Sequence, residues 1–209
     1  MKKTISELLD PKKAAIIVVD VQNDFCHPAG SAGKAGNDTA GAMAMIPRLQ
    51  ALLDAARAIG TKVIFVQTIH TPETDSDSWI GRHDTPRLTC RKDTWGAEFT
   101  IVAPDLGEPV VHKHRYSAFI NTRLDSILRT FKIETLIMTG VATNVCVEST
   151  ARDGFMLDYN VVFVGDCSAA YSQTLHEGTL ENMRKHFGVV VNHHECIAHW
   201  TSPKVPAGV

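Results

Sequence analysis

The hydrophobic positions along the chain form short apolar runs that alternate with longer amphipathic stretches. The short runs are rich in β-branched residues, which is typical of strands buried on both faces. They cover residues 14–20, 62–67, 109–112, 134–139, 161–164 and 188–191. Apolar residues at helical spacing occupy 46–60, 122–130, 145–157 and 175–186. This alternation predicts an α/β fold, a Rossmann-like three-layer αβα sandwich around a mostly parallel sheet of about six strands.

Two segments do not fit the alternation. Residues 70–106 show little periodicity and carry Trp79 and Trp95, and they are too long for an ordinary connection. We interpret them as an insertion that selects the substrate within a single domain spanning residues 1–209. Residues 192–209 are predicted as a C-terminal tail, whose Pro-containing end is either loose or docked on a neighbouring subunit.

Composition narrows the class of protein. Lys and Arg number 21 against 23 Asp and Glu, a net charge of -2, so the chain lacks the basic surface of a nucleic-acid-binding protein. No apolar run is long enough to span a bilayer, and the first residues lack the apolar core of a secretory signal. The five cysteines are widely spaced and odd in number, which favours reduced thiols. We expect a cytoplasmic protein without nucleic-acid or membrane partners.

Cys146 is the first candidate for chemistry. It stands after an apolar run and a turn at 140–144, at the start of the predicted helix 145–157. Backbone N–H groups and the positive end of the helix dipole favour the thiolate there, over a free thiol with a pKa of about 8.5. The alternative is that Cys146 is buried as a small hydrophobic residue.

Two charged residues also follow apolar runs. Asp20 ends the first run and Lys113 follows 109–112. Ligands of parallel sheets bind beyond the carboxyl ends of the strands, so we expect both side chains at the same edge as Cys146. Asp20 then accepts the thiol proton, and Lys113 lowers the pKa of the thiol and holds developing charge. The alternatives are that Asp20 caps a turn and that Lys113 is a solvated surface charge.

This set of groups fits attack of a thiolate on a carbonyl carbon, followed by hydrolysis of a thioester. The negative oxygen that forms in such an attack needs preorganised hydrogen-bond donors. We expect this oxyanion hole from the backbone N–H groups of Val141, Ala142 and Cys146.

Three ordered motifs carry a resemblance to a known family. They read VVDVQNDF at 18–25, KHRYSAF at 113–119 and TGVATNVCV at 139–147. With them, the chain resembles the isochorismatase-like cysteine hydrolases from about residue 14 to residue 191. The resemblance implies the family's fold, a catalytic triad of Asp20, Lys113 and Cys146, and a cis peptide bond between Val141 and Ala142.

Within that family, residues 115–129 and 146–155 are most similar to ureidoacrylate amidohydrolases, with biuret hydrolases and N-carbamoylsarcosine amidohydrolases close in character. The similarity implies cleavage of a C–N bond in a small linear ureido or carbamoyl amide by water, with release of ammonia and no cofactor. Because such relatives are commonly dimers or tetramers, it also implies a homo-oligomer.

Substrate-binding candidates lie in or beside the motifs and offer amide groups and flat rings, as small-ligand pockets commonly do. They are Asn23, Phe25, His70, Tyr116, Phe119 and Asn144. For the two phenylalanines the alternative is a place in the core, and for His70 a hydrogen bond to a loop carbonyl.

A catalytic metal is not expected. Nicotinamidases of the same family carry an Asp-x-His pair after the second strand. Residues 67–73 here contain one histidine, His70, and no Asp-x-His pair. The pairs His112 with His114 and His193 with His194 make poor tetrahedral sets without identified partners.

Other functions remain open on the sequence alone. A nicotinamidase-like or other small-amide hydrolase would use the same triad. Vinyl ether hydrolysis of the isochorismatase type needs no nucleophilic cysteine, and a binding protein would not need all three groups. Nucleotide binding is disfavoured because no strand is followed by a Gly-x-Gly-x-x-Gly loop.

Overall fold

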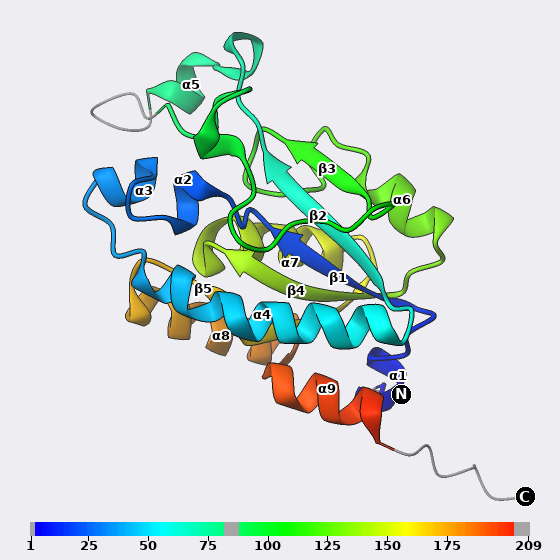
Figure 1. Ribbon diagram of the computed structural model, residues 1–209. Coiled ribbons are helices and arrows are strands. Elements are labelled where there is room, and N and C mark those ends of the chain that lie inside the picture. Colours follow the sequence, from blue (N-terminus) through cyan, green and yellow to red (C-terminus); the bar gives the residue numbers. More distant parts are fainter. Residues whose placement is uncertain (1–2, 82–87, 203–209) are drawn as a thin grey trace, which may run out of the picture.

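The computed structural model describes residues 3–81 and 88–202 and forms three layers around one sheet (Figure 1). The strands are β1 (Ala14–Val19), β2 (Lys62–Thr68), β3 (Val110–Lys113), β4 (Thr135–Val141), β5 (Asn160–Ala169) and β6 (Gly188–Val191). Their order is β3-β2-β1-β4-β5-β6, and every neighbouring pair is parallel. The predicted α/β fold with six strands is confirmed.

Helices cover both faces of this sheet, and some short ones lie beyond the carboxyl ends of its strands (Figure 1). The helices are α1 (Ile5–Leu8), α2 (Asn23–Cys26), α3 (Ser31–Lys34), α4 (Ala40–Ala58), α5 (Asp77–Ile80), α6 (Leu124–Thr130), α7 (Glu148–Met156), α8 (Gln173–His186) and α9 (His193–Thr201). Single turns of 3₁₀-helix occur at η1 (Pro72–Thr74) and η2 (Trp95–Ala97), and η3 (Thr143–Val147) is a π-helical turn.

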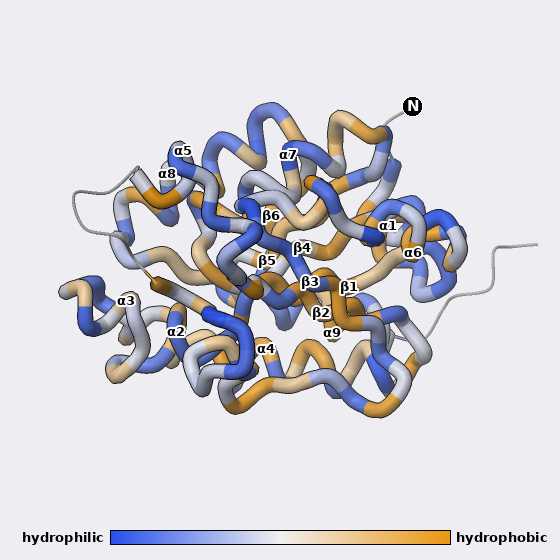
Figure 2. Tube along the Cα trace, turned by 90° about the horizontal axis from the view of Figure 1, so that it is seen from above, coloured by the Kyte–Doolittle hydropathy of each residue, from blue (hydrophilic) through white to orange (hydrophobic). Residues whose placement is uncertain are grey.

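The alternation of side chains along the central strand separates two hydrophobic cores. All six residues of β1 are buried; Ile16 and Val18 point to the core under α4 and α9, whereas Ile17 and Val19 point to the core under α6, α7 and α8. Hydrophobic colours gather on the strands between the helical layers, whose outer sides are mostly hydrophilic (Figure 2). Packing on both faces holds the strands in place, and with them the strand ends that carry the reactive groups.

The predicted insertion lies over the carboxyl ends of β1 and β2, where α5 rises above the sheet (Figure 1). Gln22 forms an isolated bridge to Phe99, and His70 forms one to Arg91, so both ends of the insertion are tied to this edge. Residues 82–87 of the predicted insertion lie outside the described residues. That the insertion selects the substrate stays a prediction.

The predicted C-terminal tail is in part a helix, which corrects the sequence interpretation. Helix α9 starts with a capping box in which Asn192 and Glu195 hold each other's backbone N–H groups, and it packs on α4. Trp200 adds a hydrogen bond from Nε1 to the carbonyl oxygen of Leu9, at 2.9 Å. The apolar residues of this segment therefore belong to the core under α4 and α9. Residues 203–209 lie outside the described part.

Within the described residues, none of the helices combines the length and the apolar character that crossing a membrane requires.

Candidate active site

The reactive edge is built where β1 and β4 end side by side. Gly140 in β4 has φ +116°, and a Cβ atom there would lie 2.0 Å from the carbonyl oxygen of Val19. Only glycine allows so close an approach at this φ. Directly after Val19, Asp20 adopts φ +53°, an uncommon left-handed conformation that Asp tolerates better than most residues. This backbone turns the carboxylate of Asp20 at the strand end toward the neighbouring strands.

Lys113 at the end of β3 reaches this carboxylate. Its Nζ lies 2.7 Å from Oδ2 of Asp20, and both side chains are almost completely buried. Nζ also donates hydrogen bonds to Thr68 Oγ1 at 2.8 Å, to the carbonyl oxygen of Arg115 at 3.0 Å and to Cys146 Sγ at 3.4 Å. Burial opposes the charge of Lys113, but the adjacent carboxylate of Asp20 favours it, and the pKa of Lys113 is raised. Lys113 is therefore a charged ammonium group.

The hydroxyl of Thr68 joins the two charges. It accepts from Lys113 and donates to Oδ1 of Asp20 at 3.0 Å, which fixes the direction of both bonds. The ammonium group thus contacts Thr68, Arg115 and Cys146 as well as the carboxylate of Asp20. Oδ2 of Asp20 lies 2.7 Å from Nζ as its charge partner, and the carboxylate also shares a hydrogen bond with the thiol of Cys146. The carboxylate of Asp20 is therefore within reach of the thiol proton.

Cys146 lies in the π-helical turn η3, immediately before α7, and its side chain is buried. Burial raises the pKa of its thiol to about 12; the ammonium of Lys113 lowers it and the carboxylate of Asp20 raises it again. Burial therefore opposes the thiolate that the helix N-terminus was expected to favour. Desolvation disfavours a charged sulfur more than the nearby positive charges favour it. The resting nucleophile is a neutral thiol between an ammonium group and a carboxylate.

The turn that leads to Cys146 has an unusual backbone. The peptide bond between Val141 and Ala142 is cis, as the family resemblance implies. The carbonyl oxygen of Ala142 accepts hydrogen bonds from the N–H groups of Val145 and Val147, on either side of Cys146. The assignment of an oxyanion hole to Val141, Ala142 and Cys146 stays a prediction.

The segment after Asp20 ties the site to the insertion. The side chain of Gln22 accepts from the N–H of Thr68 at 2.8 Å and donates to the carbonyl oxygens of Thr68 and Ala97 at 2.9 and 2.7 Å. Asn23 donates from Nδ2 to the carbonyl oxygen of Trp95 at 2.9 Å. Gln22 therefore fixes the backbone at the end of β2, and with it the position of the Thr68 hydroxyl.

Aromatic rings adjoin the reactive edge. The ring of Trp79 in α5 lies 5.6 Å from that of His70 and 4.9 Å from that of Tyr116, between ring centroids. The guanidinium of Arg115 lies over Trp79 at 4.8 Å, and the carbonyl oxygen of the same arginine accepts from Lys113. This aromatic cluster of His70, Trp79 and Tyr116 is connected to the site through Arg115.

With this geometry established, the comparison with known families is decisive. The isochorismatase domain family matches residues 14–195, which include every reactive residue described above. The chain belongs to the isochorismatase family.

Similar proteins place the chain among the hydrolases of that family. Ureidoacrylate amidohydrolase RutB of Caulobacter vibrioides (strain ATCC 19089 / CIP 103742 / CB 15) is 35% identical over 199 residues, covering 87% of this chain and 88% of that protein. A cysteine hydrolase from Pseudomonas syringae pv. phaseolicola 1448A has a TM-score of 0.81 at 28% identity, with 91% and 93% of the two chains covered. N-carbamoylsarcosine amidase from Thermoplasma acidophilum has a TM-score of 0.70 at 28% identity, with coverages of 87% and 96%. The recognised family is confirmed.

The remaining candidates of this isochorismatase-family site are placed differently. Phe119 stacks on Tyr159 with 6.0 Å between centroids and packs against the core under α7. Phe25 packs against the opposite core, and its carbonyl oxygen accepts from the hydroxyl of Tyr171. Asn144 is half-buried in η3, two residues before Cys146. Asn144 and the aromatic cluster therefore stay substrate-binding candidates, and so do the two phenylalanines, which pack against the cores but are only partly buried.

Two residues of this isochorismatase-family site were missed by sequence reasoning. Thr68 ends β2 at the same edge as Asp20. Its position at the carboxyl end of a parallel strand could therefore have identified it from sequence, as it identified Asp20. Thr150 donates to the carbonyl oxygen of Cys146 at 2.7 Å and accepts from the N–H of Ala118 at 3.0 Å. It thereby joins the turn of the nucleophile to the segment after Lys113.

Proposed function

We propose that the protein is a cysteine-dependent amidohydrolase that cleaves a C–N bond in a small linear ureido or carbamoyl amide. The observation that carries this proposal is the buried carboxylate of Asp20 beside a buried thiol that Lys113 also contacts. The same chain supplies a base, a nucleophile and a positive charge. The proposal needs no cofactor, because these three groups provide the chemistry.

In the first half of the reaction, Asp20 takes the proton of the Cys146 thiol as the sulfur attacks the substrate carbonyl. Burial makes this step depend on the base, because it raises the pKa of the thiol and disfavours the free thiolate. The tetrahedral intermediate collapses to a thioester, and the leaving nitrogen takes the proton and departs as ammonia. The backbone N–H groups of Val141, Ala142 and Cys146 hold the transient oxyanion.

In the second half, water replaces ammonia. Asp20 takes a proton from the water, the resulting hydroxide adds to the thioester carbonyl, and Cys146 leaves and regains the proton. Lys113 holds the sulfur while it carries negative charge, since its Nζ already donates to Sγ. For a ureido substrate the product is a carbamate, which decays to carbon dioxide and a second amine.

The substrate class rests on the relatives and on the aromatic cluster. The relatives include enzymes named for ureidoacrylate and N-carbamoylsarcosine, both of which carry a planar carbamoyl group. His70, Trp79 and Tyr116 present flat rings near the site, which suit a planar urea-like group. We further propose a cytoplasmic enzyme that forms a dimer or tetramer; sedimentation of the purified chain tests the oligomeric state.

The decisive experiment measures ammonia release over a panel of ureidoacrylate, biuret, N-carbamoyl amino acids, nicotinamide and simple amides. The proposal predicts turnover of at least one ureido or carbamoyl compound, with nicotinamide and simple amides at least about a hundredfold slower in kcat/KM. Turnover of nicotinamide alone would point to a nicotinamidase-like enzyme and contradict the proposed substrate class.

A further inference from the structure

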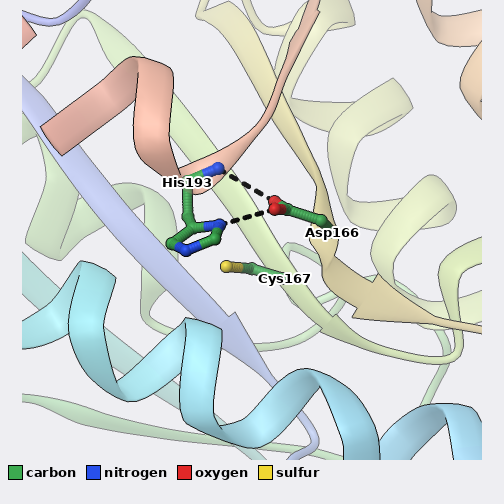
Figure 3. A group of neighbouring side chains, drawn as sticks. All are labelled: Asp166, Cys167 and His193. Atoms are coloured by element: carbon green, nitrogen blue, oxygen red, sulfur yellow. Dashed lines mark hydrogen bonds and ion pairs between the residues drawn. The ribbon is translucent and has the colours of Figure 1, made fainter. Parts of the chain in front are cut away.

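A second group of reactive side chains lies away from the catalytic edge, on the α4 and α9 face of the sheet. Asp166 and Cys167 are consecutive residues of β5, and His193 is the first residue of α9. A carboxylate oxygen, the sulfur and an imidazole nitrogen of these residues all lie within 4.8 Å of one another. Figure 3 shows the three side chains converging from the strand and the helix.

The cluster is held in place by contacts of its own. Nδ1 of His193 lies 2.5 Å from Oδ2 of Asp166, and the backbone N–H of His193 donates to Oδ1 at 2.9 Å (Figure 3). These two contacts fix both the carboxylate and the ring. Cys167 is fully buried and His193 nearly so, whereas the side chain of Asp166 is 30% exposed. The three side chains are therefore already close together, with Asp166 partly open to solvent.

We propose that Asp166, Cys167 and His193 form a binding site for a divalent cation of the zinc class. Thiolate, imidazole and carboxylate are the three ligand types that proteins use for Zn²⁺, and hard cations such as Mg²⁺ avoid sulfur. Zn²⁺ binds sulfur at about 2.3 Å and nitrogen or oxygen at about 2.0–2.2 Å, so tetrahedral ligand atoms lie about 3.3–3.8 Å apart. Side-chain adjustments of about 1 Å bring these three atoms into that range.

The protonation states balance for such a site. Burial raises the pKa of the Cys167 thiol and the negative charge of Asp166 raises it further, so the thiol binds a cation only by giving up its proton. The cation replaces this proton, which passes to water, while the neutral imidazole keeps its one hydrogen on the ring nitrogen that does not face the cation. Thiolate and carboxylate together then neutralise the two positive charges.

The site would connect two parts of the fold. Asp166 and Cys167 belong to β5, whereas His193 starts the C-terminal helix, which packs on α4. On sequence alone, His193 lacked partners for a metal site, since its neighbour His194 cannot complete a tetrahedral set. The structure supplies those partners from β5, in which Cys167 lies 26 residues before His193 in the sequence. A bound cation would fasten α9 to the sheet, and this role is independent of the proposed hydrolysis.

The test uses the full chain carrying Cys146→Ala, because the catalytic thiol can also bind soft cations. After treatment with a chelator, Zn²⁺ alone is titrated by calorimetry, and Tm is measured with and without Zn²⁺. We expect one equivalent of Zn²⁺ per chain and a rise in Tm of about 5–10 °C at a concentration about 100-fold above Kd. Co²⁺ alone should give a sulfur-to-cobalt charge-transfer band.

Matched variants in the same background assign the ligands. Cys167→Ser and His193→Gln should each weaken binding at least about tenfold, and Cys167→Ser should remove the sulfur-to-cobalt band. Cys26→Ser replaces another fully buried thiol and should bind Zn²⁺ like its parent. The proposal is overturned if the parent shows neither a Tm shift nor a sulfur-to-cobalt band, or if Cys167→Ser binds as tightly as its parent. Circular dichroism shows whether each variant is folded, and the parent's Co²⁺ spectrum decides the matter even if a variant is not.

Discussion

At the residue scale, the central feature is a nucleophile whose surroundings keep it protonated. Burial raises the pKa of the Cys146 thiol, so the neutral form is favoured over the thiolate. Lys113 lowers this pKa and Asp20 raises it, so the two charges that flank Cys146 have opposite effects on the thiol. A substitution of Asp20 can therefore change the rate of hydrolysis and the ionisation of the thiol in opposite directions.

Replacing Asp20 separates these two effects. In Asp20→Asn the negative charge is lost, so the pKa of Cys146 falls and alkylation by iodoacetamide at pH 8–9 becomes faster. Hydrolysis nevertheless falls by about 10²–10⁴-fold, because the base is gone. The rate of alkylation against pH, with ammonia release on the same samples, checks both outcomes.

Lys113→Met is the matched control for this prediction. Loss of the ammonium raises the pKa of Cys146, so alkylation and hydrolysis both become slower. Circular dichroism verifies folding, since removal of one partner leaves the other charge buried and unpaired. Equal slowing of alkylation and hydrolysis in Asp20→Asn would contradict the role of Asp20 as the base.

At the scale of elements, the end of β2 positions the charges of its neighbours. Thr68→Val keeps the shape of the side chain but removes the hydroxyl between Asp20 Oδ1 and Lys113 Nζ. We expect kcat to fall about 10- to 100-fold with little change in KM, because the loss affects alignment and not substrate contact. Thr68→Ser should restore most of the rate. A rise in KM at constant kcat would instead make Thr68 a substrate contact.

The junction of β1 and β4 gives a prediction about stability. Gly140→Ala should destabilise the fold by about 3 kcal/mol or more, because the added Cβ meets the carbonyl oxygen of Val19 and φ is +116°. Gly178→Ala in α8 is the control; nothing lies within 4 Å of its Cβ position, and it should stabilise by about 0.5–1 kcal/mol. Urea denaturation of both variants measures the difference. Equal stabilities would show that the two strands do not approach as closely as described.

At the scale of the whole molecule, the layered fold was accessible from sequence because burial on both faces leaves a local pattern. All residues of β1 are apolar and buried, so the run alone predicts a central parallel strand. The place of the reactive edge was also predictable from sequence. Ligands of parallel sheets bind beyond the carboxyl ends of the strands, so Asp20, Lys113 and Cys146 were expected together at that edge.

Features that depend on tertiary packing could not be predicted from the sequence. The direction of the Cys146 pKa shift depends on how deeply the thiol is buried, and neither the motif nor the predicted helix start encodes that. The ring contacts of Trp79 join residues from the insertion and from the segment after β3. Helix α9 did have a local signal, the capping residues Asn192 and Glu195, but its position at the end of the chain favoured the interpretation as a tail.

The insertion gives a prediction about substrate selection. Trp79→Ala removes the ring between His70 and Tyr116 and should raise KM for the best ureido substrate about tenfold, with a smaller change in kcat. Trp95→Ala is the matched control in the same insertion, since Trp95 contacts the ring of His27 instead. Steady-state kinetics of both variants decide between selection and packing. Identical effects of the two substitutions would count against the aromatic cluster as the selecting element.

The most direct test of the central claim is a rapid quench during turnover of the best ureido substrate, followed by mass spectrometry of the intact chain and its peptides. The account predicts an acyl adduct on Cys146, formed together with ammonia, no adduct on the buried Cys26 or Cys167, and neither adduct nor ammonia from Cys146→Ala. Ammonia release at the wild-type rate by Cys146→Ala would contradict it.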